Sequence, residues 1–501
     1  MYLEDKDLVS IQEVRNLVRQ AKIAQRELAQ MSQEQIDTIV KVVAKACYDE
    51  RERLAKMAVE ETGFGRWQDK VIKNTVASKV LLEHIKNMKT VGILREDTER
   101  KIIEVGVPVG VIAGLIPSTN PTSTVMYKAL ISLKAGNSIV FSPHPSALKC
   151  IVETVEVIKR AAKTAGCPDG AISVIQKTSI AATNELMCHK DTNLILATGG
   201  TAMVKAAYSS GTPAIGVGPG NGPAFIERSA DVPTAVRHII ESKTFDNGVI
   251  CASEQSVIVE EDMKDIVIAE FKKQGAYFLP PADAKKLGEF IILPSGAMNP
   301  KMVGKTPQIV AERAGISVPA DARVLIAEET RVGKDAPYSM EKLAPILGFY
   351  TVKTWEEACD LSIKILHHEG VGHTLSIHSK NDEIIREFAL KKPVSRLLVN
   401  TPAALGGVGG TTGLFPAFTL GCGAVGGSAT SDNVSPHNLY NIRRVAYGTS
   451  EYTDFLKAEN LMDSYKGTVA DSTSEALPSS SLKEDELVEL LVKQVLAKLS
   501  H

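Results

Sequence analysis

Residues 192–217, TNLILATGGTAMVKAAYSSGTPAIGV, hold the pattern that decides the fold of this chain. The apolar run NLILATGG is followed by TAMVKAAYSSG, whose apolar residues have helical spacing, and then by a second apolar run, TPAIGVG. Upstream, the same order of strand, helix and strand is repeated by NSIVFSP (137–143), ALKCIVETVEVIKRAAKTAG (147–166) and AISVIQ (171–176). This alternation predicts an α/β fold with a doubly wound parallel sheet.

In such a sheet, ligands bind in the loops that follow the carboxyl ends of the strands. Two loops of this kind are Ser142–Pro145 and Thr198–Thr201, because each directly follows a predicted strand. Both loops are therefore predicted to line a binding site.

The flanking regions predict further helices and strands. Residues 8–90 have helical spacing, and Ser32 followed by Glu34 and Gln35 predicts the start of a second helix. Beyond them, KIIEVGVPVGVIAGLIP (101–117) predicts a hairpin that leads into a buried strand.

A second α/β region is predicted from about Asp231 to Asn433. Its strand-like runs are EQSVIVEE, RVLIAEE, APILGFYTV, GHTLSIHS and SRLLVNT. Two segments near its end, ALGGVGGTTGLFPAF and LGCGAVGGSATS, are rich in glycine, which suits either close approach to a ligand or a mobile surface loop.

Composition narrows the class of protein. The chain has 501 residues, and its 57 Lys and Arg nearly balance 59 Asp and Glu, so no basic field favours nucleic acid. The longest apolar candidate, Val105 to Pro117, is too short to span a bilayer and is interrupted by Gly and Pro. The start, MYLEDKDLVS, lacks the apolar core of a signal peptide. We therefore predict an intracellular enzyme that binds neither nucleic acid nor membrane.

The seven cysteines form an odd, scattered set without a CxxC pair, which predicts neither a disulfide framework nor a metal site. Most of them are predicted to be small buried thiols. Cys251 differs, because in FDNGVICAS (245–253) it follows a predicted helix and a glycine turn and precedes a strand. A thiol at such a junction can be exposed and lie near a helix terminus that lowers its pKa, as a nucleophile requires.

FDNGVICAS also resembles the active-site cysteine segment of the aldehyde dehydrogenase superfamily, in particular of its acylating, coenzyme A-dependent branch. The resemblance covers about residues 8–460. It extends over further segments in the family's order, which are IPSTNPTST (116–124), ATGGTAMV (197–204), MEKLAPIL (340–347), EGVGHTLSIHS (369–379) and SDNVSPHNLYNIRRVAYG (431–448). It implies an aldehyde dehydrogenase fold with a Rossmann-like NAD-binding domain, an α/β catalytic domain and a small β oligomerisation element.

The resemblance also implies roles for single residues. Cys251 would be the nucleophile, Asn120 the amide that stabilises the oxyanion, and His373 a histidine near the cysteine. Glu341 would bind the nicotinamide ribose. The other implied cofactor-binding residues are Ser142, His144, Pro145, Thr198, Gly199, Gly200 and Thr201. Without the resemblance, Asn120 would be predicted as a turn residue, whereas Glu341 would fit a solvated charge as well as a site residue, and His373 a packed strand histidine as well as a site residue.

These roles fit a single reaction. The Cys251 thiolate would attack the carbonyl of an aldehyde, and the Asn120 amide and the Cys251 backbone N–H would stabilise the resulting oxyanion. Loss of hydride to NAD would then leave an acyl thioester on Cys251. Gly199 and Gly200 would let the cofactor diphosphate approach a helix N-terminus, where free amides and the helix dipole favour anions.

Departures from the superfamily pattern refine this prediction. Hydrolytic members carry a glutamate in an E-L-G-G-K pattern as the base for water, whereas GVGPGNGP (216–223) has no carboxylate. Water should then attack the thioester slowly, while the thiol of coenzyme A needs less help, with His373 as a candidate to assist it. SPHP (142–145) stands where a lysine is usual, which favours NAD over NADP. PSTN (117–120) has one residue more than the commoner proline–aromatic–asparagine turn.

The composition changes again near the C-terminus. KGTVADSTSEALPSS (466–480) predicts a flexible linker, and residues 481–501 predict an amphipathic helix. The helix has no core of its own, so it would dock on its own body, on a sister subunit or on a different protein. It resembles the encapsulation peptides of enzymes packed into bacterial microcompartments, which implies shell proteins as partners and a cytoplasmic location inside such a compartment.

The expected organisation follows from these segments. It comprises an NAD-binding domain at 1–230, with a hairpin at about 98–110 used in oligomerisation, a catalytic domain at 231–433 and an oligomerisation segment at 434–465. An apolar strand pair needs a partner edge, so we expect a homodimer or a homotetramer.

The expected function is oxidation of a short aliphatic aldehyde, propionaldehyde before acetaldehyde, to its acyl-coenzyme A. A hydrolytic aldehyde dehydrogenase would instead release the free acid at the same rate without coenzyme A. A homologue that has lost catalysis and serves as a scaffold would bind NAD without turnover, although Cys251, Asn120 and Glu341 together argue against it.

Overall fold

The computed structural model describes residues 5–466, so the predicted tail helix and nearly all of the predicted linker lie outside the described residues. The described residues form two compact units, one of residues 5–96 and 103–445 and the other of residues 97–102 and 446–466. In the second unit, the structure describes α17 (Tyr452–Ala458) and α18 (Met462–Lys466). Within residues 5–466, no helix has the length and apolar character needed to cross a membrane.

The first unit contains a five-stranded sheet in which every pairing is parallel. Its order is β5-β4-β3-β6-β7, and its strands are β3 (Val111–Ile116), β4 (Ser138–Pro143), β5 (Ile172–Val174), β6 (Thr192–Thr198) and β7 (Ala214–Val217). The chain adds β4 and β5 on one side of β3 and then β6 and β7 on the other. This reversal makes a topological switch point between β3 and β6, and ligands bind at the carboxyl ends of strands at such points. The predicted doubly wound, Rossmann-like sheet is confirmed.

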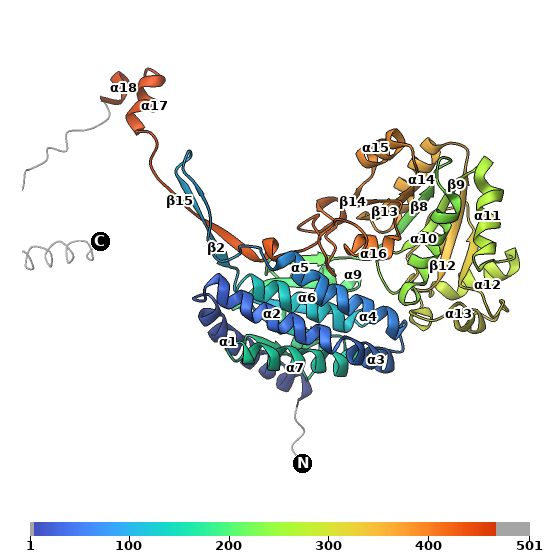
Figure 1. Cartoon of the computed structure of the whole chain (residues 1–501), viewed down its shortest axis with the longest axis horizontal. Helices are drawn as coiled ribbons and strands as arrows, with labels where there is room; N and C mark the ends of the chain where they lie inside the picture. The colour runs from blue at the N-terminus through green and yellow to red at the C-terminus, as the bar shows by residue number, and fades with distance from the viewer. Residues whose placement is uncertain (1–4, 467–501) are drawn as a thin grey trace, which may run out of the picture. The chain divides into compact units, whose positions relative to one another are not determined.

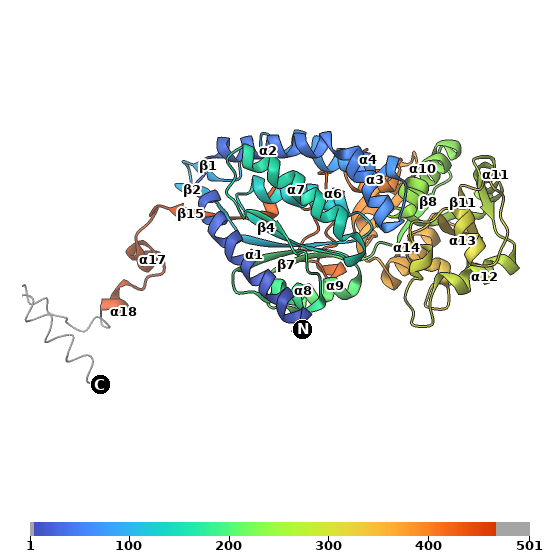
Figure 2. The ribbon, with the colours of Figure 1, turned by 90° about the horizontal axis from the view of Figure 1, so that it is seen from below.

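Helices cover both faces of this sheet, because its strands are apolar on both faces (Figure 2). Alternate residues of one strand belong to different cores: Ile112 packs on one side of the sheet and Val111 on the other. The helices on the Ile112 side are α2 (Gln33–Asp49), α6 (Pro121–Lys134) and α7 (Leu148–Thr164). Those on the Val111 side are α1 (Lys6–Leu28), α8 (Ile180–Cys188) and α9 (Thr201–Ser209).

The predicted start of the second helix is confirmed at Ser32. Its hydroxyl oxygen accepts a hydrogen bond from the Gln35 N–H at 3.3 Å, and the Gln35 side-chain oxygen accepts one from the Ser32 N–H at 2.9 Å. This reciprocal pair satisfies backbone donors that would otherwise lack partners. The N-terminal helices continue with α3 (Arg51–Thr62), α4 (Trp67–Thr75), a π-helical turn (Val76–Val80) and α5 (Leu81–Ile85).

A second, seven-stranded sheet is also parallel throughout and has the order β10-β11-β12-β9-β8-β13-β14. The five predicted strands form β9 (Glu254–Glu260), β11 (Val324–Glu328), β12 (Ile346–Val352), β13 (Gly372–His378) and β14 (Val394–Val399). The structure also contains β8 (Gly222–Ile226) and β10 (Ala276–Phe278), which were not among the predicted strands. Its helices are α10 (Val232–Thr244), α11 (Lys264–Lys273), α12 (Pro281–Ile291), α13 (Pro307–Arg313), α14 (Trp355–His368), α15 (Asp382–Lys391) and α16 (Ala403–Gly407).

The predicted hairpin is displaced from its expected place. It is formed by β1 (Gly92–Asp97) and β2 (Ile102–Pro108), so its turn lies at residues 98–101, at the very start of the segment 101–117 that was expected to contain the whole hairpin. β2 belongs to a three-stranded sheet with β1 and β15 (Tyr440–Ala446), while β3 is central in the five-stranded sheet (Figure 1). Val109 and Gly110 therefore join two sheets, and Gly110 adopts a φ of 130° that suits glycine. The predicted domain boundaries and the role of this small sheet in oligomerisation stay predictions.

Candidate active site

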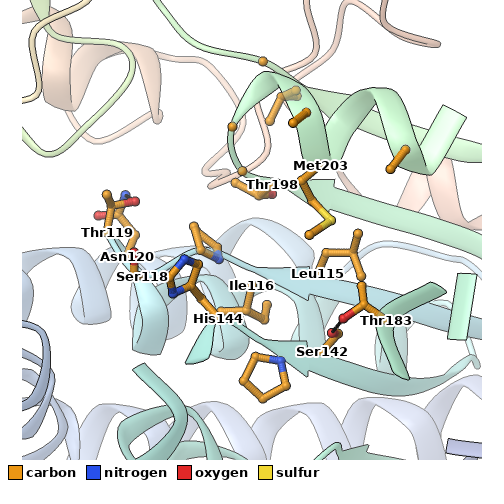
Figure 3. Close-up of a pocket in the computed structure, with 18 of the residues that line it drawn as sticks. Leu115, Ile116, Ser118, Thr119, Asn120, Ser142, His144, Thr183, Thr198 and Met203 are labelled. Carbon is orange, nitrogen blue, oxygen red and sulfur yellow. Dashed lines mark hydrogen bonds between the residues drawn. The ribbon is translucent and has the colours of Figure 1, made fainter. Parts of the chain in front are cut away.

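A large cavity lies at the carboxyl ends of the strands of the five-stranded sheet. Its volume is about 730 Å³, and it is lined by residues of the loops that follow β3, β4, β6 and β7. Asn120, Cys251 and Glu341 also line it. Figure 3 shows Asn120 beside Thr119 on one side of this space, with Ser142 farther along it. The structure thus gathers most of the predicted site residues around one cavity of the size that small-molecule sites have.

Cys251 is carried by a tight turn between α10 and β9. The turn begins with η3 (Phe245–Gly248), in which Asp246 and Asn247 adopt the left-handed conformation, with φ of 51° and 52°. Such backbone geometry persists only where surrounding contacts fix it. One such contact is the Asp246 carboxylate, which accepts a hydrogen bond from the Arg66 N–H at 2.7 Å.

The surroundings of Cys251 favour its neutral thiol. Burial, followed by the negative charge of Glu341, raises the pKa of this thiol to about 12, while the Arg396 guanidinium opposes the shift. The expectation that a helix terminus lowers the pKa of Cys251 is therefore wrong, because desolvation of the thiolate dominates. The nucleophilic thiolate has to form by loss of a proton as part of the reaction.

Asn120 is the N-cap residue of α6, directly before Pro121 at the first helical position. It is thus both a turn residue before a proline and a residue of the cavity wall. Its side-chain carbonyl oxygen accepts a hydrogen bond from the Lys73 ammonium at 2.7 Å. This contact leaves the amide nitrogen as the end of the side chain that can donate to a ligand.

Glu341 lines the same cavity and touches the glycine-rich stretch at 216–223. One of its carboxylate oxygens accepts a hydrogen bond from the Gly220 N–H at 2.9 Å, and its own N–H donates to Glu369 at 2.7 Å. Burial, followed by the charge of Glu369, raises the pKa of Glu341 to about 8. Residues 216–223, which contain no carboxylate, are therefore in contact with the Glu341 carboxyl group. Because its pKa is raised, this carboxyl group is mostly protonated at neutral pH.

Glu341→Gln is expected to speed the alkylation of Cys251 by iodoacetamide, but only at alkaline pH. Below about pH 8 the Glu341 carboxyl is protonated and neutral, so wild type and variant should react alike. Above that pH the wild-type carboxylate opposes the thiolate of Cys251, and the variant removes this charge. The measurement is the alkylation rate against pH, with the exposed Cys188 removed in both proteins. A variant that is faster at every pH, or at none, would contradict this electrostatic coupling.

The loop after β6 leads directly into α9. Gly200 is the N-cap of this helix, no side chain of the described residues caps it, and Thr201 is its first residue. A Cβ placed on Gly200 would meet no described atom within 4 Å, and one on Gly199 would meet only Met203 at 3.7 Å. Packing therefore does not require these glycines, and their backbone faces open space at a helix N-terminus, as a diphosphate would need. Thr198, Gly199 and Gly200 line the cavity, whereas Thr201 is not among the lining residues.

The loop after β4 supplies the opposite wall. Ser142, His144 and Pro145 all line the cavity, and the Ser142 hydroxyl is hydrogen-bonded to that of Thr183 at 2.9 Å (Figure 3). Among the described lining residues there is no Lys or Arg. This end of the cavity therefore offers no cation to a 2′-phosphate, which is consistent with the preference for NAD that the sequence predicts.

His373 lies outside this group. It is fully buried on β13, its Nδ1 is hydrogen-bonded to the Thr374 hydroxyl at 2.8 Å, and its Nε2 has no partner among the described residues. Burial lowers its pKa to about 3, and the nearby Arg396 adds to the effect. His373 does not line the cavity. The structure therefore brings together Cys251, Asn120 and Glu341 but does not place His373 against the same space.

Two structural features of the site were missed from sequence. The buried lysines of α4 contact Asn120 and the turn before Cys251, and the Arg396 guanidinium lies near the Cys251 thiol. In WQDKVIKNT (67–75) these lysines have the spacing of an ordinary amphipathic helix, so no local signal separates them from solvated charges. Within residues 5–466, no group of three or more His, Cys, Asp or Glu side chains is arranged to hold a metal ion.

Comparison with known proteins agrees with this geometry. Residues 7–278, more than half of the chain, match the aldehyde dehydrogenase family. The chain belongs to the aldehyde dehydrogenase family. Over 444 residues this aldehyde dehydrogenase is 45% identical to the bifunctional aldehyde-alcohol dehydrogenase AdhE of Escherichia coli (strain K12). That alignment covers 88% of this chain and 50% of the relative, so the chain spans about half the length of this relative.

Other relatives match over nearly their whole length. Over 438 residues the chain is 40% identical to the succinate-semialdehyde dehydrogenase (acetylating) of Clostridium kluyveri, covering 87% of this chain and 96% of that protein. Together with the structures below, this relative places the chain with the acylating members of the aldehyde dehydrogenase family, and hence among the oxidoreductases.

Solved structures show the same fold. A probable aldehyde dehydrogenase from Listeria monocytogenes is 70% identical, with a TM-score of 0.90 over 90% of this chain and 100% of that one. An acetylating aldehyde dehydrogenase from Geobacillus thermoglucosidasius is 54% identical, with a TM-score of 0.88 over 90% and 99% of the two chains. A propionaldehyde dehydrogenase from a Clostridium phytofermentans fucose utilisation bacterial microcompartment is 29% identical, with a TM-score of 0.79 over 88% and 98%. The predicted aldehyde dehydrogenase fold is confirmed.

Proposed function

We propose that this chain oxidises a short aliphatic aldehyde to the corresponding acyl-coenzyme A, with NAD⁺ as oxidant and coenzyme A as acyl acceptor. The observation that carries the proposal is the placement of Cys251 and Asn120 in one cavity with a glycine turn at a helix N-terminus. Relatives that are named acetylating support the acyl transfer. For this chain we propose only the aldehyde-oxidising reaction, because it spans half of the bifunctional relative.

The cavity fits a dinucleotide. Backbone amides at the start of α9 face open space for a diphosphate, and Glu341 is available to a nicotinamide ribose. When bound, NAD⁺ supplies the hydride acceptor. The residues that would hold it are Thr198, Gly199, Gly200 and Thr201 at the diphosphate, Glu341 at the ribose, and Ser142, His144 and Pro145 on the adenosine side.

The chain's own residues account for the first half of the reaction. Cys251 loses its proton and its sulfur attacks the aldehyde carbonyl, giving a tetrahedral thiohemiacetal with a negatively charged oxygen. The Asn120 amide N–H and the Cys251 backbone N–H donate to that oxygen, which contributes about 3–4 kcal/mol per donor in comparable sites. After loss of hydride, the acyl group remains on Cys251 as a thioester.

The second half of the reaction transfers the acyl group. The thiol of coenzyme A attacks the thioester carbon and gives up its proton, the bond from that carbon to the Cys251 sulfur breaks, and the departing Cys251 thiolate takes up a proton to restore the thiol. Since residues 216–223 have no carboxylate to activate water, a thiol nucleophile is favoured over hydrolysis. His373 is a candidate to accept the proton of the coenzyme A thiol. This role requires the buried Nε2 atom of His373 to become accessible. His373→Asn should then slow acyl transfer and leave acylation of Cys251 unchanged.

The walls near Cys251 support a short aliphatic substrate. Val249 and Ile250, which directly precede Cys251, line the cavity together with Met298 and Leu343, and no Lys or Arg among the described lining residues would pair with a substrate carboxylate. Burying an unpaired charge is costly, so a neutral aldehyde suits this site better than succinate semialdehyde. We propose propionaldehyde as the first substrate and acetaldehyde as the next. The test is NADH formation from these aldehydes with and without coenzyme A.

We also propose that the enzyme is cytoplasmic cargo of a bacterial microcompartment. Separately, we propose that it forms a homodimer or homotetramer through the β1-β2-β15 sheet. A structural neighbour named for a microcompartment supports the location. Exposed Ile442 and Val445 on β15 support a subunit contact there. Light scattering tests the oligomeric state.

Removal of residues 466–501 is expected to leave turnover unchanged and to abolish co-sedimentation with shell proteins. The reason is that the tail sequence resembles an encapsulation peptide, whereas the described residues that line the cavity lie between 115 and 343, and His373 also precedes the tail. The measurement is NADH formation together with sedimentation of the full and shortened chains with shells. Loss of turnover in the shortened chain would mean instead that the tail packs on the body of the enzyme.

A further inference from the structure

A buried cluster of charged side chains lies behind Asn120 and the turn that carries Cys251. Lys70 and Lys73 lie one turn apart on α4, and their side chains are only 3% and 2% exposed. Both donate to the same carboxylate oxygen of Asp246, at 2.8 and 2.5 Å. The mechanism proposed above uses none of these three residues. Buried charges are costly, so their place beside the reacting groups requires an explanation.

Lys73 connects the two groups that would hold the oxyanion. Besides Asp246, its ammonium donates to the Asn120 side-chain oxygen at 2.7 Å and to the Val249 carbonyl at 2.8 Å. Val249 lies two residues before Cys251. One nitrogen atom therefore bridges the Asn120 side chain and the turn that carries Cys251.

The chemistry of the ammonium fixes the orientation of the Asn120 amide. An ammonium has three donors and no acceptor, so only the amide oxygen can face it. The amide nitrogen is then the end that remains, and its described contact is with the Thr119 hydroxyl at 3.4 Å, too long to compete with a ligand. A cation beside the carbonyl oxygen also strengthens donation by the nitrogen of the same amide.

We infer that Lys73 is a positioning residue for the oxyanion of the reaction proposed above, acting through the Asn120 amide and the Val249 carbonyl. The inference rests on the proposed function, because it needs an oxyanion to form at Cys251. Donors aimed at such a charge are effective when they are held in place before it develops. Lys73 supplies that restraint to Asn120.

Lys70 is a matched control for the burial of charge. It lies on the same helix, is equally buried and binds the same Asp246 oxygen, but its remaining contact is with the Thr119 carbonyl at 2.9 Å. Lys70→Met therefore removes a buried cation from the same cluster without removing a contact to the Asn120 side chain.

The test is a double-mutant cycle with Asn120→Ala. Lys73→Met is expected to lower kcat about 10²-fold, as loss of an oxyanion donor does, with the KM for NAD⁺ unchanged. Adding Lys73→Met to Asn120→Ala should cost little more, since the lysine acts through an amide that is already absent. Lys70→Met should lower the thermal midpoint by a similar amount but change kcat only a few-fold. The alkylation rate of Cys251 is measured in each variant to show that the thiol stays accessible.

Two results would overturn the inference. The first is a double variant whose fall in kcat equals the product of the falls in Lys73→Met and Asn120→Ala. The second is a fall in kcat for Lys70→Met as large as that for Lys73→Met. If Lys73→Met fails to fold, Lys73→Arg takes its place in the same cycle, because it keeps a cation for Asp246 while changing the geometry toward Asn120. A wild-type enzyme without coenzyme A-dependent turnover would refute the proposed function, which is a different outcome.

Discussion

Cys251→Ala is expected to abolish NADH formation from propionaldehyde, lowering the rate by roughly 10⁴-fold or more, as loss of a nucleophile does. The sulfur of Cys251 is the atom that forms the bond to the substrate in the proposed reaction, and alanine offers no nucleophile in its place. The remaining wall of the cavity, including Asn120 and Glu341, is unchanged by this substitution. Binding of NAD⁺, measured by fluorescence or calorimetry, should therefore survive while turnover is lost.

The matched control is Cys188→Ala, which removes an exposed thiol. It should leave turnover at the wild-type rate, and it should leave inactivation by iodoacetamide intact, because the reactive group in that assay is Cys251. Persistent NADH formation in Cys251→Ala would assign the chemistry to another residue. NAD⁺ binding without any turnover in the wild-type protein would favour the scaffold alternative.

The parallel sheets could be predicted from sequence because their signal is local. Each of the strands β4, β5 and β6 is a short apolar run followed by a helix, and both faces of the sheet are buried, so the runs are nearly continuous. The short strand β10 could not be found in this way, because only Ala276 of its three residues is buried, whereas all three residues of the equally short β5 are buried. The hairpin was predicted in the wrong place because the Val- and Gly-rich run at 105–114 continues from one sheet into another without a change in composition.

In the candidate site, local sequence patterns predicted the loops but not the contacts between residues that are distant in sequence. The rule for loops after strands led to Ser142–Pro145 and Thr198–Thr201, because the switch point of a parallel sheet fixes their location, and of the second loop Thr201 does not line the cavity. The pKa of Cys251 depends on Glu341 and Arg396, which are distant in sequence, and so could not be predicted from its helix and turn. Lys73 was missed for the same reason, since its burial is created by Asp246 and Asn120 from other parts of the chain.

Coenzyme A is expected to raise steady-state NADH formation by about 10²-fold or more, since general-base catalysis of the kind water would need contributes roughly 10²–10⁴-fold. Without coenzyme A, each Cys251 should form one acyl thioester and then release it slowly, so a burst of NADH should precede a slow phase. Stopped-flow absorbance separates the two phases, and acid-quenched protein should carry the acyl group on Cys251 by mass spectrometry. Equal steady-state rates with and without coenzyme A would contradict the proposal and favour a hydrolytic enzyme.

Gly218→Glu is expected to give the chain coenzyme A-independent turnover, because it restores a carboxylate to the stretch that lacks one. Gly218 lines the cavity, and a Cβ placed there would meet no described atom within 4 Å, so a side chain can be added without displacing the backbone. Its carboxylate could then take a proton from a water molecule that attacks the thioester on Cys251. Gly218→Gln has nearly the same size but no basic group, so it should remain dependent on coenzyme A. If both variants hydrolyse the thioester at equal rates, or if neither differs from the wild type, the missing carboxylate is not what directs the acyl group to a thiol.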